Sequence, residues 1–119
     1  MLAIHEVQIA QHGGAPGIRD RALLQSALAR PQHAAAYADA GVPEVAALYA
    51  IGVIKNHPFY DGNKRVGAIL LETFLQLNAF TLEAVDAELF RAILGLAAND
   101  LNDQAFVAWV RMHARPQKR

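Results

Sequence analysis

Hydrophobic residues recur at intervals of three and four along most of this 119-residue chain, a pattern typical of amphipathic helices. We expect six helices, whose limits are set by capping residues, prolines and glycines. In chain order they span residues 2–11, ended by Gly13-Gly14; 21–30, capped by Asp20 and stopped by Pro31; 43–56, with Pro43 in the first turn; 63–77, ended by Asn78; and two further helices capped by Asp86 and Asn102. Alternation with a period of two is confined to Phe80-Thr81-Leu82. The pattern predicts an all-α domain.

The segment from Pro43 to Asn56 is apolar nearly all round, as expected for a helix at the centre of a bundle. We expect two sets of apolar residues in the last two helices to face the core. They are Leu89, Phe90, Ile93 and Leu94 in the fifth helix, and Phe106 and Trp109 in the sixth. Residues 33–41 are small and rich in turn formers, which favours an exposed loop. The chain is therefore expected to be one domain, residues 1–119, forming a compact six-helix bundle with a short loop or hairpin flap near residues 33–41.

Composition narrows the class of protein. The chain is 54% hydrophobic and 18% charged, which excludes a disordered chain. Eleven basic and eleven acidic residues give no net charge, so direct nucleic-acid binding is not expected. Cysteine is absent, the N-terminal residues lack a signal-peptide pattern, and the densest apolar run is too short to span a bilayer. We expect a cytoplasmic protein that does not insert into membranes.

The chemistry of the chain is concentrated between its two most apolar helices, in the nine residues from His57 to Arg65. Most of them have an ordinary structural explanation, because Asp-Gly is a common turn and Asn a common helix cap. That explanation fails at Lys64 and Arg65. Two cations in the first turn of a helix are each unfavourable by a few tenths of a kcal/mol unless an anion binds there. Free backbone N–H groups, Gly62 and these cations together predict a phosphate site.

Two further residues of this segment add chemistry to the predicted phosphate site. A carboxylate beside phosphate oxygens is a plausible seat for Mg²⁺, which gives Asp61 a role. His57 can titrate near neutral pH, and it is suited to accept a proton from a hydroxyl group. Phe59 is expected to be a core residue that fixes the loop. The combination predicts phosphoryl or nucleotidyl transfer.

This stretch resembles the signature of the Fic/Doc superfamily, His-x-Phe-x-(Asp/Glu)-Gly-Asn-(Gly/Lys)-Arg. The match is complete at the following positions: His57, Phe59, Asp61, Gly62, Asn63 and Arg65. Enzymes of the family that transfer AMP usually have glycine at the next-to-last position and a second arginine three residues after the first. Here those positions hold Lys64 and Ala68, so the chain resembles the Doc (death-on-curing) branch. Residues 13–20 and 24–31 also look like segments of that branch.

The resemblance implies a toxin of a type II toxin–antitoxin system that acts as an ATP-dependent protein kinase. Its target class would be translation elongation factor Tu, modified on a threonine, which arrests translation. Carried onto this chain, His57 is the base, Asp61 the Mg²⁺ ligand, and Gly62, Asn63, Lys64 and Arg65 bind the phosphates of ATP. Residues 33–41 would align the target.

The resemblance also implies how the protein is silenced. Its expected partner is a cognate antitoxin whose disordered tail covers the site. The internal inhibitory motif of some Fic proteins, (Ser/Thr)-x-x-x-Glu-(Gly/Asn), is absent, so we expect inhibition in trans.

Two alternatives remain open from the residues alone. An AMP transferase would use the same site and attack a different phosphorus atom of ATP. A catalytically idle binding module, or a helix-turn-helix protein built on residues 18–30, would not need the intact base and carboxylate. A zinc hydrolase is excluded, because His5-Glu6 is not completed by a second histidine at Ile9.

Overall fold

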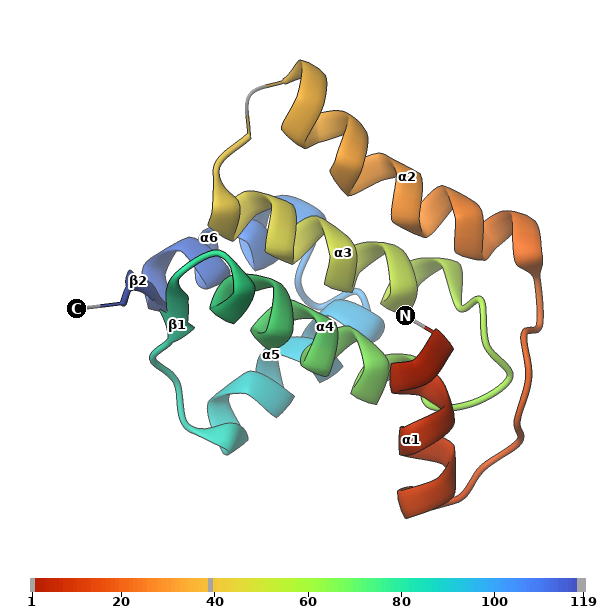
Figure 1. The fold of residues 1–119 in the computed structure, drawn as a ribbon. Coiled ribbons are helices and arrows are strands. Elements are labelled where there is room, and N and C mark those ends of the chain that lie inside the picture. The colour runs from red at the N-terminus through yellow and green to blue at the C-terminus, as the bar shows by residue number, and fades with distance from the viewer. Residues whose placement is uncertain (1, 39, 118–119) are drawn as a thin grey trace.

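The computed structural model describes residues 2–38 and 40–117. These residues form six helices and two short strands in the order α1 (Leu2–His12), α2 (Arg21–Tyr37), α3 (Val42–Asn56), α4 (Asn63–Leu77), β1 (Phe80–Leu82), α5 (Asp86–Ala97), α6 (Asp103–His113) and β2 (Ala114–Pro116). The prediction of a compact helical bundle is confirmed (Figure 1). Among the described residues, no helix is long and apolar enough to cross a membrane.

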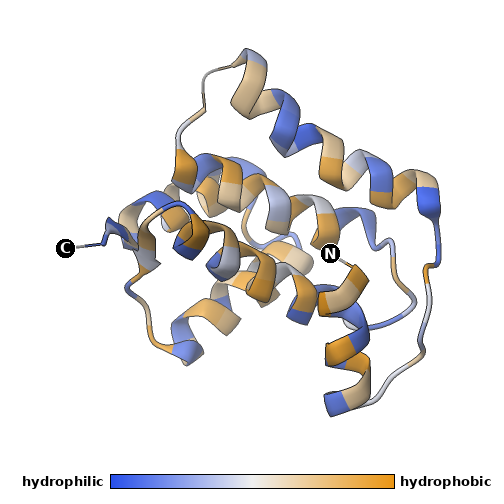
Figure 2. Ribbon diagram, in the orientation of Figure 1, coloured by the Kyte–Doolittle hydropathy of each residue, from blue (hydrophilic) through white to orange (hydrophobic). Residues whose placement is uncertain are grey.

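Helix α3 is the centre of the bundle. Nine of its fifteen residues are buried, and it packs against α2, α4, α5 and α6 (Figure 1). Most of its residues are apolar, as the orange and beige turns of α3 in Figure 2 show, which is why it can be covered on several sides at once. Gly41 precedes it and Pro43 lies in its first turn, as the sequence predicts.

The core is divided into two clusters of buried side chains. The larger cluster joins α3, α4, α5 and α6, with residues such as Ile51, Leu71, Ile93 and Phe106. The smaller cluster touches α3 near its C-terminal end. It consists of Leu24, Val53, Phe59 and Val66. Because Phe59 belongs to the α3–α4 loop, the smaller cluster attaches that loop to the core.

The two short strands form a small sheet: β1 follows α4, and β2 follows α6. Strand β1 pairs antiparallel with β2, and Phe80, Thr81 and Leu82 face Pro116, Arg115 and Ala114 respectively. The short alternating piece of sequence at residues 80–82 therefore does form a strand. Its partner follows α6 directly and was not predicted.

The loop or flap predicted near residues 33–41 is shorter than expected, because residues 33–37 belong to a helix, and the prediction that Pro31 stops the second helix is wrong. Helix α2 continues through Pro31 to Tyr37, and residues 38–41 are what connects it to α3, with residue 39 outside the described residues. Proline inside a helix costs roughly 3 kcal/mol. Here its ring is buried on the same face as Leu24 and Ala27, and three strong helix formers, residues 34–36, follow it. Burial of the ring and high helix propensity offset the lost hydrogen bond.

Two smaller predictions about α5 also need correction. The residue that caps α5 is Val85, not Asp86, because Glu88 Oε1 accepts a hydrogen bond from the Val85 N–H at 3.2 Å. Leu89 and Ile93 face the core as predicted, but Phe90 and Leu94 are more than half exposed. In α6, Phe106 is fully buried and Trp109 only partly so. The caps predicted for α2 and α6 are confirmed, since Asp20 and Asn102 accept from the N–H groups of Leu23 and Ala105.

We predict that Gly52→Ala destabilises the protein. A Cβ at this position would lie 3.0 Å from the Cα, Cβ and carbonyl oxygen of Ala27, so the backbones of α2 and α3 would have to separate. Overpacking of this kind costs about 1–3 kcal/mol, more than the gain in helix propensity of up to about 1 kcal/mol. The matched control is Gly95→Ala, where the Cβ would meet only the movable side chain of Leu101. Urea unfolding should show a loss for Gly52→Ala alone; equal stability of the two variants would contradict this packing.

Candidate active site

The loop between α3 and α4 begins with a strained residue. His57 is the C-cap of α3 and adopts a left-handed backbone, with φ 53° and ψ 53°. This conformation costs a residue with a Cβ about 1–2 kcal/mol, so the surroundings must hold it in place. The His57 N–H donates to the Val53 carbonyl at 3.1 Å, and Pro58 prevents the helix from continuing. As a result the imidazole is exposed at the helix end instead of being buried in the bundle.

Arg19 and its neighbour hold the loop from outside. The guanidinium of Arg19 donates from Nε to the His57 carbonyl at 2.7 Å and from Nη2 to the Asn56 carbonyl at 3.0 Å. The backbone N–H groups of Arg19 and Asp20 both donate to the Pro58 carbonyl, at 2.7 and 3.1 Å. A cation thus binds the free carbonyls at the C-terminus of α3, where the helix dipole favours positive charge.

Asn63 fixes the loop from inside. Its Oδ1 accepts a hydrogen bond from the Phe59 N–H at 3.1 Å, and its Nδ2 donates to the Phe59 carbonyl at 3.0 Å. Phe59 is fully buried and Asn63 is 4% exposed, so both backbone groups of Phe59 depend on this amide for hydrogen bonding. The prediction that Phe59 is a core residue is confirmed. Both ends of the Asn63 side-chain amide are bonded within the loop, so its backbone N–H is the group expected to face a ligand.

Asp61 is held by the N-terminal segment of the chain. Its Oδ2 accepts from the Ala15 N–H at 3.2 Å, and its backbone carbonyl accepts from Nε2 of His5 at 3.0 Å. The carboxylate is exposed and keeps free lone pairs. Among the described residues, no three acidic or histidine side chains gather to bind a metal on their own. One carboxylate next to a phosphate site is nevertheless the donor set that Mg²⁺ uses when substrate phosphates and water complete its coordination.

The N-terminus of α4 is open and positively charged. Gly62 precedes the helix with φ 80°, no side chain caps it, and the first turn contains no acidic residue. Among α2 to α6, α4 alone lacks both a side-chain cap and an acid at its start. The ion pairs of the described residues join Arg30 to Asp103, Arg111 to Glu44 and Arg115 to Glu83. Within that part of the chain, Lys64 and Arg65 therefore have no acidic partner.

The predicted site residues line one pocket of about 530 Å³. One wall consists of His57, Asp61, Gly62, Asn63, Lys64 and Arg65. The rest of the lining is apolar and comes mainly from α5. It consists of Ile54, Phe90, Ile93, Leu94 and Ala97. The pocket is thus cationic on one side and apolar on the other, which suits a ligand with an anionic tail and an aromatic or apolar head.

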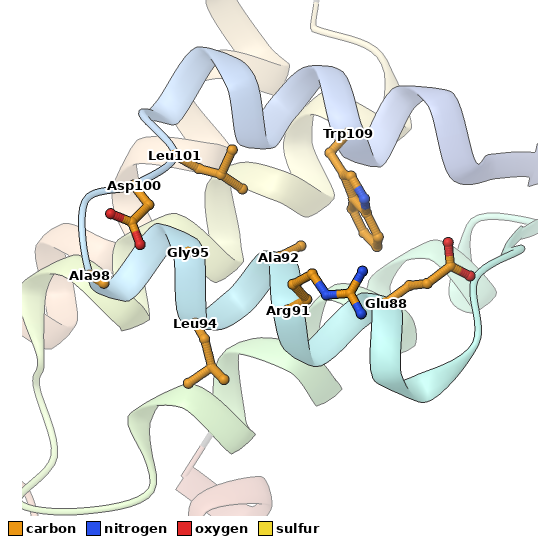
Figure 3. A pocket seen from close by; sticks show the side chains of 9 residues that line it. All are labelled: Glu88, Arg91, Ala92, Leu94, Gly95, Ala98, Asp100, Leu101 and Trp109. Atoms are coloured by element: carbon orange, nitrogen blue, oxygen red, sulfur yellow. The ribbon is translucent and has the colours of Figure 1, made fainter.

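A second pocket, of about 630 Å³, lies between α5 and α6, and none of the predicted catalytic, phosphate-binding or metal-binding residues lines it. Figure 3 shows Trp109 reaching from α6 toward Ala92 and Arg91 of α5, whereas Leu94 points away from it. The charged side chains around this pocket are Glu88, Arg91 and Asp100, so it has no surplus of positive charge and no histidine or nucleophile. Its lining does not suggest catalysis.

Comparison with known proteins agrees with the motif. The Fic/DOC family matches residues 1–75, which include the whole loop. Over 104 residues the chain is 29% identical to "Protein kinase doc" of Escherichia phage P1, covering 86% of this chain and 81% of that protein. Over 83 residues it is 39% identical to "Toxin Doc" of Mycolicibacterium smegmatis, covering 67% of this chain and 62% of that protein. The chain belongs to the Fic/DOC family.

Sequence reasoning missed two residues that shape the site, His5 and Arg19. His5 stands four residues before Ile9 on α1 and is only 3% exposed, although the sequence suggested nothing beyond a failed zinc motif. Its position on the apolar stripe of α1 was the one sequence feature that indicated burial of His5. Arg19 gave no comparable signal, because its partners lie 37 and 38 residues away in the sequence.

We predict that Asn63→Ala lowers the free energy of unfolding by at least about 2 kcal/mol, because two buried backbone groups of Phe59 lose their partner. The matched control is Asn78→Ala. Asn78 also bonds a carbonyl four residues away, that of Phe74, but it is exposed, so the loss should stay within about 0.5 kcal/mol. Urea unfolding of both variants measures the difference, and comparable losses would show that the amide of Asn63 does not hold the loop.

Proposed function

We propose that this chain is a Doc-type toxin that transfers the γ-phosphoryl group of ATP to a hydroxyl group of a target protein. The observation that carries the proposal is one pocket that is lined both by an exposed imidazole and by an uncapped, doubly cationic helix N-terminus. Membership of the Fic/DOC family and likeness to a protein named as a kinase support it. By resemblance, the target is translation elongation factor Tu, and its modification would arrest translation in the cytoplasm.

The proposed mechanism assigns one task to each group. The phosphates of ATP bind to the backbone N–H groups at residues 62–64 and to the side chains of Lys64 and Arg65. A ring nitrogen of His57 takes the proton from the target hydroxyl as its oxygen bonds to the γ-phosphorus. The bond from the γ-phosphorus to the bridging oxygen breaks, and ADP leaves. Mg²⁺, held by Asp61 and the phosphates, would neutralise charge on the phosphate oxygens.

Two residues support phosphoryl over AMP transfer. By resemblance, AMP transferases have a second arginine at the position of Ala68, and here Ala68 is 7% exposed within the larger core cluster. Position 68 therefore contributes no cation to the pocket. Lys64 stands where those enzymes have glycine and adds a cation at the start of the helix. An AMP transferase is the second candidate, supported by the apolar wall that could receive an adenine ring near the phosphates.

Silencing by a separate antitoxin is part of the proposal. A relative that covers most of this chain is named as a toxin, and toxins of this kind are inhibited by a partner. The pocket is open to solvent at His57, Asp61, Lys64 and Arg65, so a disordered tail that folds over it could block nucleotide or target. The absence of net charge remains consistent with a protein partner and no direct nucleic acid.

Incubation with elongation factor Tu and labelled ATP tests the reaction. We expect label from γ-labelled ATP, and none from α-labelled ATP, to appear on the factor. His57→Ala should abolish transfer but leave ATP binding nearly unchanged, because the imidazole is assigned to the proton and not to the phosphates. Transfer from α-labelled ATP would establish the AMP transferase instead, and ATP binding without any transfer would favour an idle binding module.

Lys64→Ala should weaken ATP binding about tenfold or more, because a hydrogen bond to a charged group contributes roughly 1.5–3 kcal/mol. The control is Lys55→Ala, which removes an exposed lysine that is bonded to Asn99 and lies outside the pocket. Calorimetric titration with Mg²⁺ and ATP should show a change for the first variant alone. Unchanged affinity of Lys64→Ala would remove this side chain from the phosphate site.

A further inference from the structure

Asp61 receives two hydrogen bonds, and both come from the first fifteen residues of the chain. His5 of α1 binds its backbone carbonyl, and the Ala15 N–H binds its carboxylate. The two donors belong to one continuous unit, since the Gly13 N–H donates to the Ile9 carbonyl at 2.8 Å and so ties the glycine turn to the end of α1. The N-terminal unit therefore contacts both the backbone and the side chain of one loop residue.

The contact made by His5 is specific in its geometry. The ring lies parallel to that of Phe59, with centroids 3.9 Å apart and planes 8° apart. A carbonyl oxygen can only accept, so Nε2 of His5 carries the proton and donates it to Asp61. The edge of the same ring lies beside the next residue, because a Cβ on Gly62 would lie 3.8 Å from Cδ2 of His5. The stack on Phe59 and the hydrogen bond to Asp61 together fix the position of the loop relative to α1.

The turn at residues 13–15 packs closely against the side chain of Asp61. A Cβ on Gly14, whose φ is 112°, would lie 3.1 Å from both Cβ and Oδ2 of Asp61. Gly13, with φ 79°, has open space at the corresponding position. The carboxylate is therefore packed against the backbone at Gly14 and restrained by the Ala15 N–H. Its orientation is set by the turn and not by its own rotamer preference alone.

We infer that His5, Gly14 and Ala15 form a clamp that positions Asp61, and that His5 is a positioning residue of the site. The part of this inference that concerns Mg²⁺ rests on the proposed function, in which Asp61 holds the metal. Groups that orient a metal ligand affect metal binding roughly ten- to hundredfold although they do not touch the metal. Because the clamp positions Asp61, the packing of α1 against the loop affects the affinity for Mg²⁺.

The glycine pair gives the cleanest test. Gly14→Ala and Gly13→Ala both place alanine at a positive φ, but only the first pushes a methyl group against Asp61. We expect Gly14→Ala to raise the Mg²⁺ concentration that half-saturates ATP binding roughly tenfold, while ATP binding without Mg²⁺ stays unchanged. Gly13→Ala should leave both unchanged. Equal Mg²⁺ dependence of the two variants would overturn the carboxylate half of the clamp.

The histidine half is tested by His5→Phe, which keeps a ring for the stack but removes the donor, and by His5→Gln, which keeps a donor at a similar reach. The control is His113→Phe. His113 also stacks on an aromatic ring, Trp109 at 4.3 Å, and bonds a carbonyl, but it lies outside the pocket. Amide hydrogen exchange of residues 58–65, measured without metal or nucleotide, should be faster in His5→Phe alone and return toward the wild-type rate in His5→Gln.

Failure of the clamp and failure of the proposed function are distinguishable. If the wild-type protein binds no ATP, the proposed function fails, and the exchange rates still decide whether His5 holds the loop. If it binds ATP with Mg²⁺ and the variants change neither exchange nor Mg²⁺ dependence, the clamp alone is wrong. Should thermal melting show that His5→Phe does not fold, the Gly14 and Gly13 variants still decide whether the N-terminal unit positions the Asp61 carboxylate.

Discussion

The site depends on one buried contact, the double hydrogen bond between the side-chain amide of Asn63 and the backbone of Phe59. Phe59 places the loop in the smaller core cluster, and burial of its backbone would be costly without both bonds. The contact joins the first residue of α4 to the middle of the loop. The core of the bundle therefore fixes the positions of the residues between His57 and Arg65 that line the pocket.

The two helix ends at this junction are treated in opposite ways. The C-terminus of α3 is satisfied by the protein itself, because the guanidinium of Arg19 donates to the carbonyls of Asn56 and His57. The N-terminus of α4 has no side-chain cap and adds two cations to a partial positive charge. A helix end that is left unsatisfied costs stability in the free protein, and a bound anion would recover it. This asymmetry is the physical reason to place phosphate at α4.

Local rules were enough to predict most of the scaffold and the position of the loop. The Asp20 and Asn102 caps and the starts of α3 and α4 follow from residues within one turn of each other. The failures involve contacts between distant parts of the chain. Pro31 was read as a stop because burial of its ring by tertiary packing has no local signature. His5 lies 56 residues from Asp61, and a single sequence contains no sign of that contact. Phe90 and Leu94 were assigned to the core because an amphipathic stripe does not show where a pocket interrupts the packing.

The proposed function requires that a polyphosphate binds at the first turn of α4. Titration with Mg²⁺ and ATP, followed through the backbone amide resonances in nuclear magnetic resonance spectra, tests it residue by residue. We expect the largest shifts at Gly62, Asn63 and Lys64, whose N–H groups would donate to phosphate oxygens. Shifts confined to the pocket between α5 and α6, around Arg91 and Trp109, with the α4 amides unmoved, would contradict it.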